Sequence, residues 1–183
     1  MKRRAAVLGL TLMLAACASE DGPKRGTGLA PPANASLGLV DLEGETVGIA
    51  LLTEGTGGVF LEIELTGVAS GGHGIHVHET GDCTPPFAGA GGHFNPDGKK
   101  HGRDNSAGPH VGDLANVHVP ESMILSASFL VEGATLKTRA RASLADQDGS
   151  ALVVHQDLDD YETDPEGNAG SRIACGVIFA NPS

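Results

Sequence analysis

Short apolar runs separated by turn-forming residues extend along most of the chain after residue 35. The clearest is the stretch 59–66, in which Leu61, Ile63 and Leu65 alternate with Glu62 and Glu64. Because successive side chains of a strand point to opposite faces, this pattern predicts a strand with one buried face and one wet face. Further runs predict strands at 36–42, 46–53, 76–78, 115–119, 124–131, 151–155 and 173–180, and 133–149 is predicted to be mostly loop. Eight short strands without a convincing helix favour an antiparallel sandwich or a flattened barrel.

The first 35 residues are predicted to lie outside this domain, which is assigned to residues 36–183. A basic start, a short apolar run and the tetrapeptide ending at Cys17 resemble the signal peptide of a bacterial lipoprotein, here residues 1–16. The resemblance implies cleavage before Cys17, lipid attachment to its sulfur and anchoring to a membrane of the cell envelope, with the periplasm or outer membrane as the expected address. Residues 17–35 are predicted to form a flexible tether. An ordinary secretory signal is the alternative, and it also exports the chain.

Removal of Cys17 from the count leaves Cys83 and Cys175, an even number in an oxidising compartment, which predicts one disulfide. The net charge of −11 argues against nucleic acid as a partner. Aromatic residues are only 3% of the chain, Trp is absent and Gly numbers 27, so bulky side chains do not dominate the core. A small β-domain held partly by metals and by a disulfide fits this composition.

Six of the eight histidines fall between residues 73 and 113. In the predicted strand 76–78, His76 and His78 are two apart and therefore point to the same side, whereas Val77 points to the other. The Gly- and Pro-rich segment that follows cannot be regular structure, and it contains His93, His101, His110 and Asp113. Neutral imidazoles and a carboxylate are metal ligands of intermediate hardness, so this segment is predicted to wrap around a cation.

His155, at the end of a later predicted strand, completes two possible ligand sets. Four imidazoles, from His76, His78, His93 and His155, suit copper(II), which favours tetragonal nitrogen coordination. Three imidazoles and a carboxylate, from His93, His101, His110 and Asp113, suit tetrahedral zinc. The two sets need eight ligand places from seven residues, so His93 is predicted to bind both metals through its two ring nitrogens.

These residues resemble the copper/zinc superoxide dismutase family, in its bacterial lipoprotein form. The resemblance covers roughly residues 36–180, and the matching segments are 74–79, 92–96, 101, 110–114, 153–155 and 167–178. It implies an eight-stranded Greek-key β-barrel, a sandwich of the immunoglobulin-like kind, and disproportionation of superoxide to dioxygen and hydrogen peroxide. The homodimer found in some bacterial members is left open.

The resemblance also implies roles for individual residues. His93 would release copper on its reduction and carry a proton to the nascent peroxide, and Arg172 would hold the superoxide anion beside the metal. The Cys83–Cys175 disulfide would position the loop before His93, and Asp159 would hydrogen-bond one ligand of each metal, with Asp157 and Asp160 as competitors for this role. Unlike the lysine-bearing loop typical of the family, the segment from His155 to Arg172 is strongly acidic.

Two other functions are weighed against this one. A non-catalytic copper- or zinc-binding envelope protein could keep the fold, but it would need no anion site such as Arg172. A mononuclear zinc hydrolase would need an open zinc position and a general base, and the chain has no HExxH-type pair. The two remaining histidines are predicted to be structural: His73 through hydrogen bonds beneath the copper strand, and His118 as an ordinary strand residue.

Overall fold

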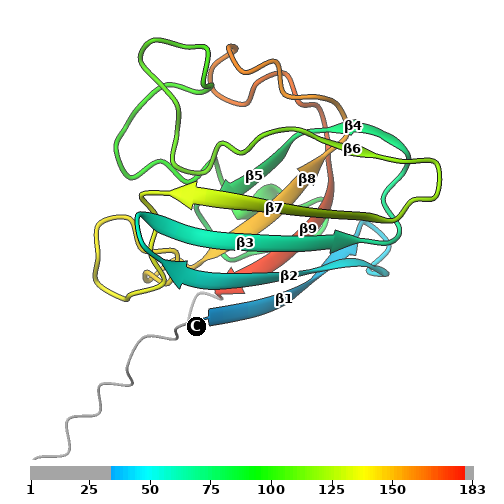
Figure 1. The fold of residues 1–183 in the computed structure, drawn as a ribbon, viewed down its shortest axis with the longest axis horizontal. Coiled ribbons are helices and arrows are strands. Elements are labelled where there is room, and N and C mark those ends of the chain that lie inside the picture. Colours follow the sequence, from blue (N-terminus) through cyan, green and yellow to red (C-terminus); the bar gives the residue numbers. More distant parts are fainter. Residues whose placement is uncertain (1–33, 180–183) are drawn as a thin grey trace, which may run out of the picture. The chain divides into compact units, whose positions relative to one another are not determined.

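The computed structural model describes residues 34–179, and these form an all-β unit (Figure 1). The predicted signal peptide, Cys17 and nearly all of the predicted tether lie outside the described residues. No helix within residues 34–179 has the length and apolar character needed to cross a bilayer. The first predicted strand begins earlier than expected, so Asn34 and Ala35, assigned to the tether, belong to it.

Seven strands form one antiparallel sheet. β1 (Asn34–Asp41), β2 (Thr46–Gly55) and β3 (Gly58–Leu65) are consecutive neighbours, and β7 (Leu125–Glu132) pairs with β3. On the other side, β9 (Arg172–Phe179) pairs with β1, β8 (Ser150–His155) with β9, and β5 (Ile75–His78) with β8. Figure 1 shows the sheet curling around a shared interior, which confirms the predicted Greek-key barrel.

All eight predicted strands are present, and the described residues form one further short strand that was not predicted. β4 (Gly71–His73) pairs with β6 (Val117–Val119) in a separate two-stranded sheet. β4 contains two glycines, which give no alternation of apolar and polar side chains for sequence reasoning to detect. The segment 133–149 contains no helix and no named strand, as expected. A short 3-10 turn, η1 (Ala88–Ala90), lies in the loop between Cys83 and His93.

Alternation along the strands separates two regions of packed side chains. Leu61, Ile63 and Leu65 of β3 point into the main core, and Glu62 and Glu64 are exposed, as the pattern predicted. In the same way, Val77 of β5 joins the main core. Residues of β8 contribute to both sides: Leu152 and Val154 pack in the main core, and Ala151 and Val153 pack in a second cluster with Phe87, Ala90 and Cys175.

The second cluster attaches the loop 83–92 to the sheet. Cys83 and Cys175 form the predicted disulfide, with their Cα atoms 5.6 Å apart. Phe87 and Ala90 of the same loop are fully buried. The loop that precedes His93 is therefore held covalently and by apolar packing against β8 and β9.

Candidate metal centre

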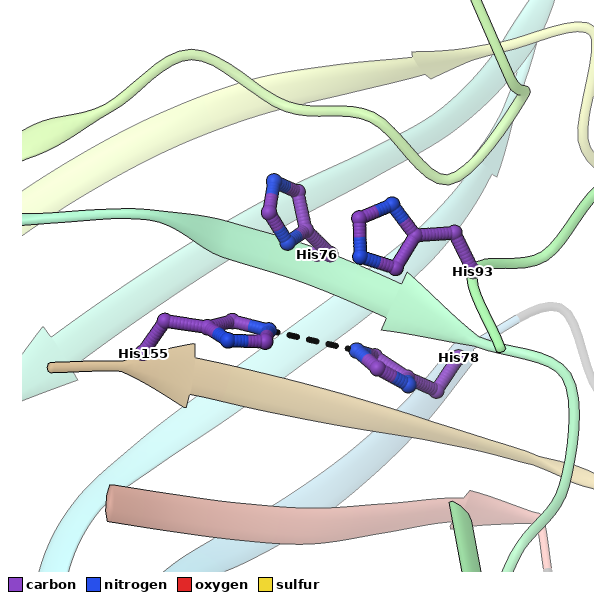
Figure 2. A group of neighbouring side chains, drawn as sticks. All are labelled: His76, His78, His93 and His155. Atoms are coloured by element: carbon purple, nitrogen blue, oxygen red, sulfur yellow. Dashed lines mark hydrogen bonds between the residues drawn. The ribbon is translucent and has the colours of Figure 1, made fainter. Parts of the chain in front are cut away.

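Four imidazoles converge at the end of the sheet where β5 meets β8. His76 and His78 come from β5, His155 ends β8, and His93 comes from the loop after η1; Figure 2 shows the four rings turned toward one another. One ring nitrogen from each lies within 4.8 Å of the others, and all four residues are buried. A register shift between Val154 and His155 accompanies the turn of His155 toward β5.

The hydrogen bonds of these rings determine which nitrogen faces the shared space. Nδ1 of His78 donates to the carbonyl of Gly91 at 3.0 Å, and Nδ1 of His155 donates to the carbonyl of Gly170 at 3.3 Å. In the neutral tautomers assigned by these carbonyl partners, each Nε2 carries a lone pair. The two Nε2 atoms are only 3.4 Å apart. Two facing lone pairs at this distance repel each other, and a cation ligated by both nitrogens would make the arrangement favourable.

A second donor group lies in the segment 93–113. Oδ1 of Asp113 is 2.8 Å from Nδ1 of His93, 3.1 Å from Nδ1 of His101 and 3.2 Å from Nδ1 of His110. The other oxygen of Asp113 accepts hydrogen bonds from the backbone N–H groups of Gly102 and His110, and these bonds fix the plane of the carboxylate. Three imidazole nitrogens and one carboxylate oxygen in this arrangement are the donor set of a tetrahedral zinc site.

His93 is the residue that both groups share. Its Nδ1 faces Asp113, and its Nε2 is buried with no hydrogen-bond partner. Nδ1 of His76 in the first group is buried and unpartnered in the same way, and Nδ1 of His101 in the second is buried and makes no well-aligned hydrogen bond, although Oδ1 of Asp113 lies 3.1 Å away. Because buried polar atoms are almost always satisfied, these three orphaned nitrogens fit a pair of metal ions that the two groups would hold.

Asp159 joins the two groups through its carboxylate. Its Oδ2 accepts a hydrogen bond from Nε2 of His76, and its Oδ1 accepts one from Nε2 of His101, both at 2.9 Å. Each bond leaves the Nδ1 of its histidine turned toward a donor group. Asp159 is buried, whereas its two sequence competitors, Asp157 and Asp160, are exposed.

Two residues that sequence reasoning missed hold Asp159 in place. The Asn116 side chain bonds both the N–H and the carbonyl of residue 159, at 2.9 and 2.8 Å. Gly167, at φ 65°, lies so close to Asp159 and His101 that a Cβ atom would collide with both side chains. Neither residue carries a signal in the sequence that would assign this role.

Arg172 lies beside the first group at the start of β9, where it is paired in register with His155. Its Nη1 donates to the carbonyl of Phe87 at 2.8 Å, and its Nη2 donates to the carbonyl of Gly91 at 2.7 Å. The Gly91 carbonyl is also the acceptor for His78. One peptide group of the disulfide-anchored loop therefore orients both a cationic side chain and a candidate metal ligand.

Burial controls the protonation of three imidazoles in the first group. It lowers the pKa of His78 well below its usual range, the pKa of His93 to about 4 and the pKa of His155 to about 3. These imidazoles are therefore neutral at physiological pH, which is the form that binds metals. Burial also disfavours charge on His101, but hydrogen bonds and charges from Asp113 and Asp159 outweigh it and raise the pKa of His101 to about 9.

The two remaining histidines lie outside both groups. His73 is buried, and its ring nitrogens lie 2.8 Å from the carbonyl oxygen of His155 and 3.0 Å from that of Ala69, in line with the predicted structural role. His118 is exposed in β6.

A curled antiparallel barrel with two adjoining donor groups that share one imidazole is the framework of a dinuclear metalloprotein. Comparison with known proteins makes the class specific. Residues 46–178 match the family model described as copper/zinc superoxide dismutase, and the chain belongs to this family.

Relatives of known name and structure agree with this assignment. Superoxide dismutase [Cu-Zn] 2 of Aquifex aeolicus is 41% identical over 181 residues, which are 97% of this chain and 99% of that protein. A double mutant of a superoxide dismutase-like protein from Bacillus subtilis superposes with a TM-score of 0.77 at 37% identity, covering 81% of this chain and 100% of that one. Cu/Zn superoxide dismutase from Brucella abortus gives a TM-score of 0.63 at 27% identity, with 79% and 99% covered.

Proposed function

We propose that this protein disproportionates superoxide to dioxygen and hydrogen peroxide as a copper/zinc superoxide dismutase. Copper would be held by His76, His78, His93 and His155, and zinc by His93, His101, His110 and Asp113. The observation that carries this proposal is the shared His93, whose two ring nitrogens belong to two different donor groups. A protein that only stored metal would need neither a shared imidazole nor a fixed arginine beside the first group.

Bound copper would supply the one-electron redox chemistry, which redox-inert zinc cannot provide. The chain's own residues would do the rest. Arg172 offers a permanent positive charge to hold superoxide at the metal centre, and its two carbonyl partners keep the guanidinium in one orientation. Nε2 of His93 is the atom that would carry a proton to the peroxide product, while Nδ1 of the same ring remains in the second group.

The function is tested with a superoxide assay on protein loaded with both metals. His155→Ala should remove the activity, because it deletes one of the four nitrogens of the first group. His118→Ala is the matched control, since this imidazole is exposed and outside both groups, and it should keep wild-type activity. Full activity in His155→Ala would refute the copper assignment. Stoichiometric binding of both metals without activity in the wild type would favour the non-catalytic metal-binding protein.

We also propose that the mature chain is a lipoprotein of the bacterial cell envelope, anchored through Cys17 in the periplasm or on the outer membrane. The support is the order of basic, apolar and small residues before Cys17. Mass spectrometry of the envelope-bound protein should find a lipid-modified Cys17 at the N-terminus, and Cys17→Ala should release the chain from the membrane. A homodimer is compatible with the family, and light scattering of the metal-loaded protein would decide between one and two copies.

A further inference from the structure

The acidic loop between β8 and β9 places one carboxylate on Arg172. Oε1 of Glu166 accepts a hydrogen bond from Nη2 of Arg172 at 3.2 Å and forms an ion pair with it. The same Nη2 also donates to the carbonyl of Gly91, and Nη1 donates to that of Phe87. The Arg172 side chain is 15% exposed and that of Glu166 is 49% exposed. Two backbone carbonyls therefore hold the mostly buried guanidinium, and its carboxylate partner is about half exposed.

The other acidic side chains of this loop are engaged elsewhere or stand free of Arg172. Asp160 accepts from Thr163 and Asn168, and Asp164 pairs with Lys100. Asp159 binds the histidines of the two donor groups. Among the described residues of the chain, Glu166 is the acidic residue that forms an ion pair with Arg172.

The backbone keeps Glu166 near the site. Its neighbour Gly167 donates to the carbonyl of Thr163 at 2.7 Å and accepts from the N–H of Asp160 at 2.9 Å, and it packs tightly against Asp159. A carboxylate tethered in this way competes for Arg172 at a high effective concentration. An anion that approaches the metal centre must share the guanidinium with Glu166 or displace it.

We propose that Glu166 is a tethered competitor for Arg172 and sets the affinity of the metal centre for small inorganic anions, superoxide among them. The inference deepens the proposed function and rests on it, because it assumes that anions bind where Arg172 meets the first donor group. Glu166 acts through Arg172 and is a positioning residue, not a catalytic one. The Glu166 carboxylate weakens the binding of every anion to Arg172. It thereby prevents other anions of the medium from occupying the guanidinium permanently.

The test measures azide binding to the copper- and zinc-loaded protein from its visible absorption. Removal of an ion pair of this exposure should tighten azide binding in Glu166→Gln by about three- to fivefold. Glu162→Gln is the matched control: it removes the same charge from the same loop, and this exposed side chain forms no hydrogen bond or ion pair among the described residues. Glu166→Asp keeps the charge but shortens the reach, and it should resemble Glu166→Gln.

A second measurement needs no copper. Arg172 should react faster with phenylglyoxal in Glu166→Gln than in the wild type or in Glu162→Gln, with the modified peptide identified by mass spectrometry. Equal changes of azide affinity in Glu166→Gln and Glu162→Gln would overturn the inference, since they would reflect loop charge alone. If the wild type binds no copper, the proposed function fails, and an unchanged phenylglyoxal rate in Glu166→Gln would then overturn this inference separately.

Discussion

Replacement of Asp159 by Ala should weaken the binding of both metals, because this carboxylate orients one ring of each donor group. The variant loses two buried hydrogen bonds of 2.9 Å, to Nε2 of His76 and to Nε2 of His101, and a third at 2.6 Å from the backbone N–H of Tyr161. A hydrogen bond to a charged group contributes about 1.5–3 kcal/mol, and loss of such a partner typically lowers metal affinity about 10- to 100-fold, or about 1.4–2.7 kcal/mol. We expect a loss of this size for each metal.

The effect should be local, because Asn116 holds the backbone of residue 159 independently of its side chain. Competition titrations with chelators of known affinity would measure zinc and copper separately in the wild type and in Asp159→Ala. Asp157→Ala is the matched control, since Asp157 is an exposed carboxylate of the same loop. Unchanged affinity for both metals in Asp159→Ala would refute the proposal that this carboxylate orients the ligands, and an equal loss in Asp157→Ala would assign the effect to loop charge.

Three further predictions concern stability and are checked by urea denaturation. Joint substitution of Cys83 and Cys175 by Ala should lower the free energy of unfolding by about 2–5 kcal/mol, and a reducing agent should then destabilise the wild type but not the variant. Leu61→Ala should lower it by about 2–5 kcal/mol, because Leu61 is fully buried, whereas Glu62→Ala on the exposed face should change it by less than about 0.5 kcal/mol. Glu54→Gln should lower it by about 1 kcal/mol at neutral pH. Burial would raise the pKa of Glu54, but hydrogen bonds from Leu136 and Thr135 and the charge of Lys137 lower it. Because the pKa of Glu54 is lower in the folded state, its carboxylate stabilises the fold fully above the unfolded-state pKa, and this stabilisation is lost as the pH falls through the folded-state pKa. The difference in the free energy of unfolding between wild type and Glu54→Gln should therefore shrink in acid. A difference that stays constant with pH would contradict this reasoning.

Strand positions could be predicted wherever side chains alternate. The prediction for 59–66 succeeded because the apolar side chains of Leu61, Ile63 and Leu65 are buried on one face and the charged side chains of Glu62 and Glu64 are solvated on the other. β4 could not be predicted, since the pairing of Gly71 and Gly72 with β6 depends on neighbours far along the chain and not on side-chain pattern.

The seven proposed ligands could be grouped from the sequence, but the choice of ring nitrogen could not. That choice depends on backbone carbonyls, such as those of Gly91 and Gly170, which no side-chain pattern reveals. The resemblance favoured Asp159 over Asp157 and Asp160, but the physical reason for this choice, the burial of Asp159 in the folded loop, is not visible in the sequence. The Glu166–Arg172 ion pair also had no sequence signal beyond the acidity of its segment.

The two donor groups differ in what holds them. Three of the four imidazoles in the first group lie on β5 and β8, whose ladder and core packing are made by protein groups alone. The second group lies within the segment 93–113, in which the described chain has no named strand. There the shape depends on a few contacts, such as those of Asp113 with Gly102 and of Asp164 with His101 and Lys100.

Metal binding to such a loop is coupled to the ordering of the loop itself. His93 is the loop residue that also completes the first group, so metal binding to the second group also affects the first. A cation in the second group would fix Nδ1 of His93 and thereby present Nε2 to His76, His78 and His155. We therefore expect metal binding at the second site to order the segment 93–113. Until that segment is ordered, the first site has its three strand histidines in place but lacks a correctly positioned His93.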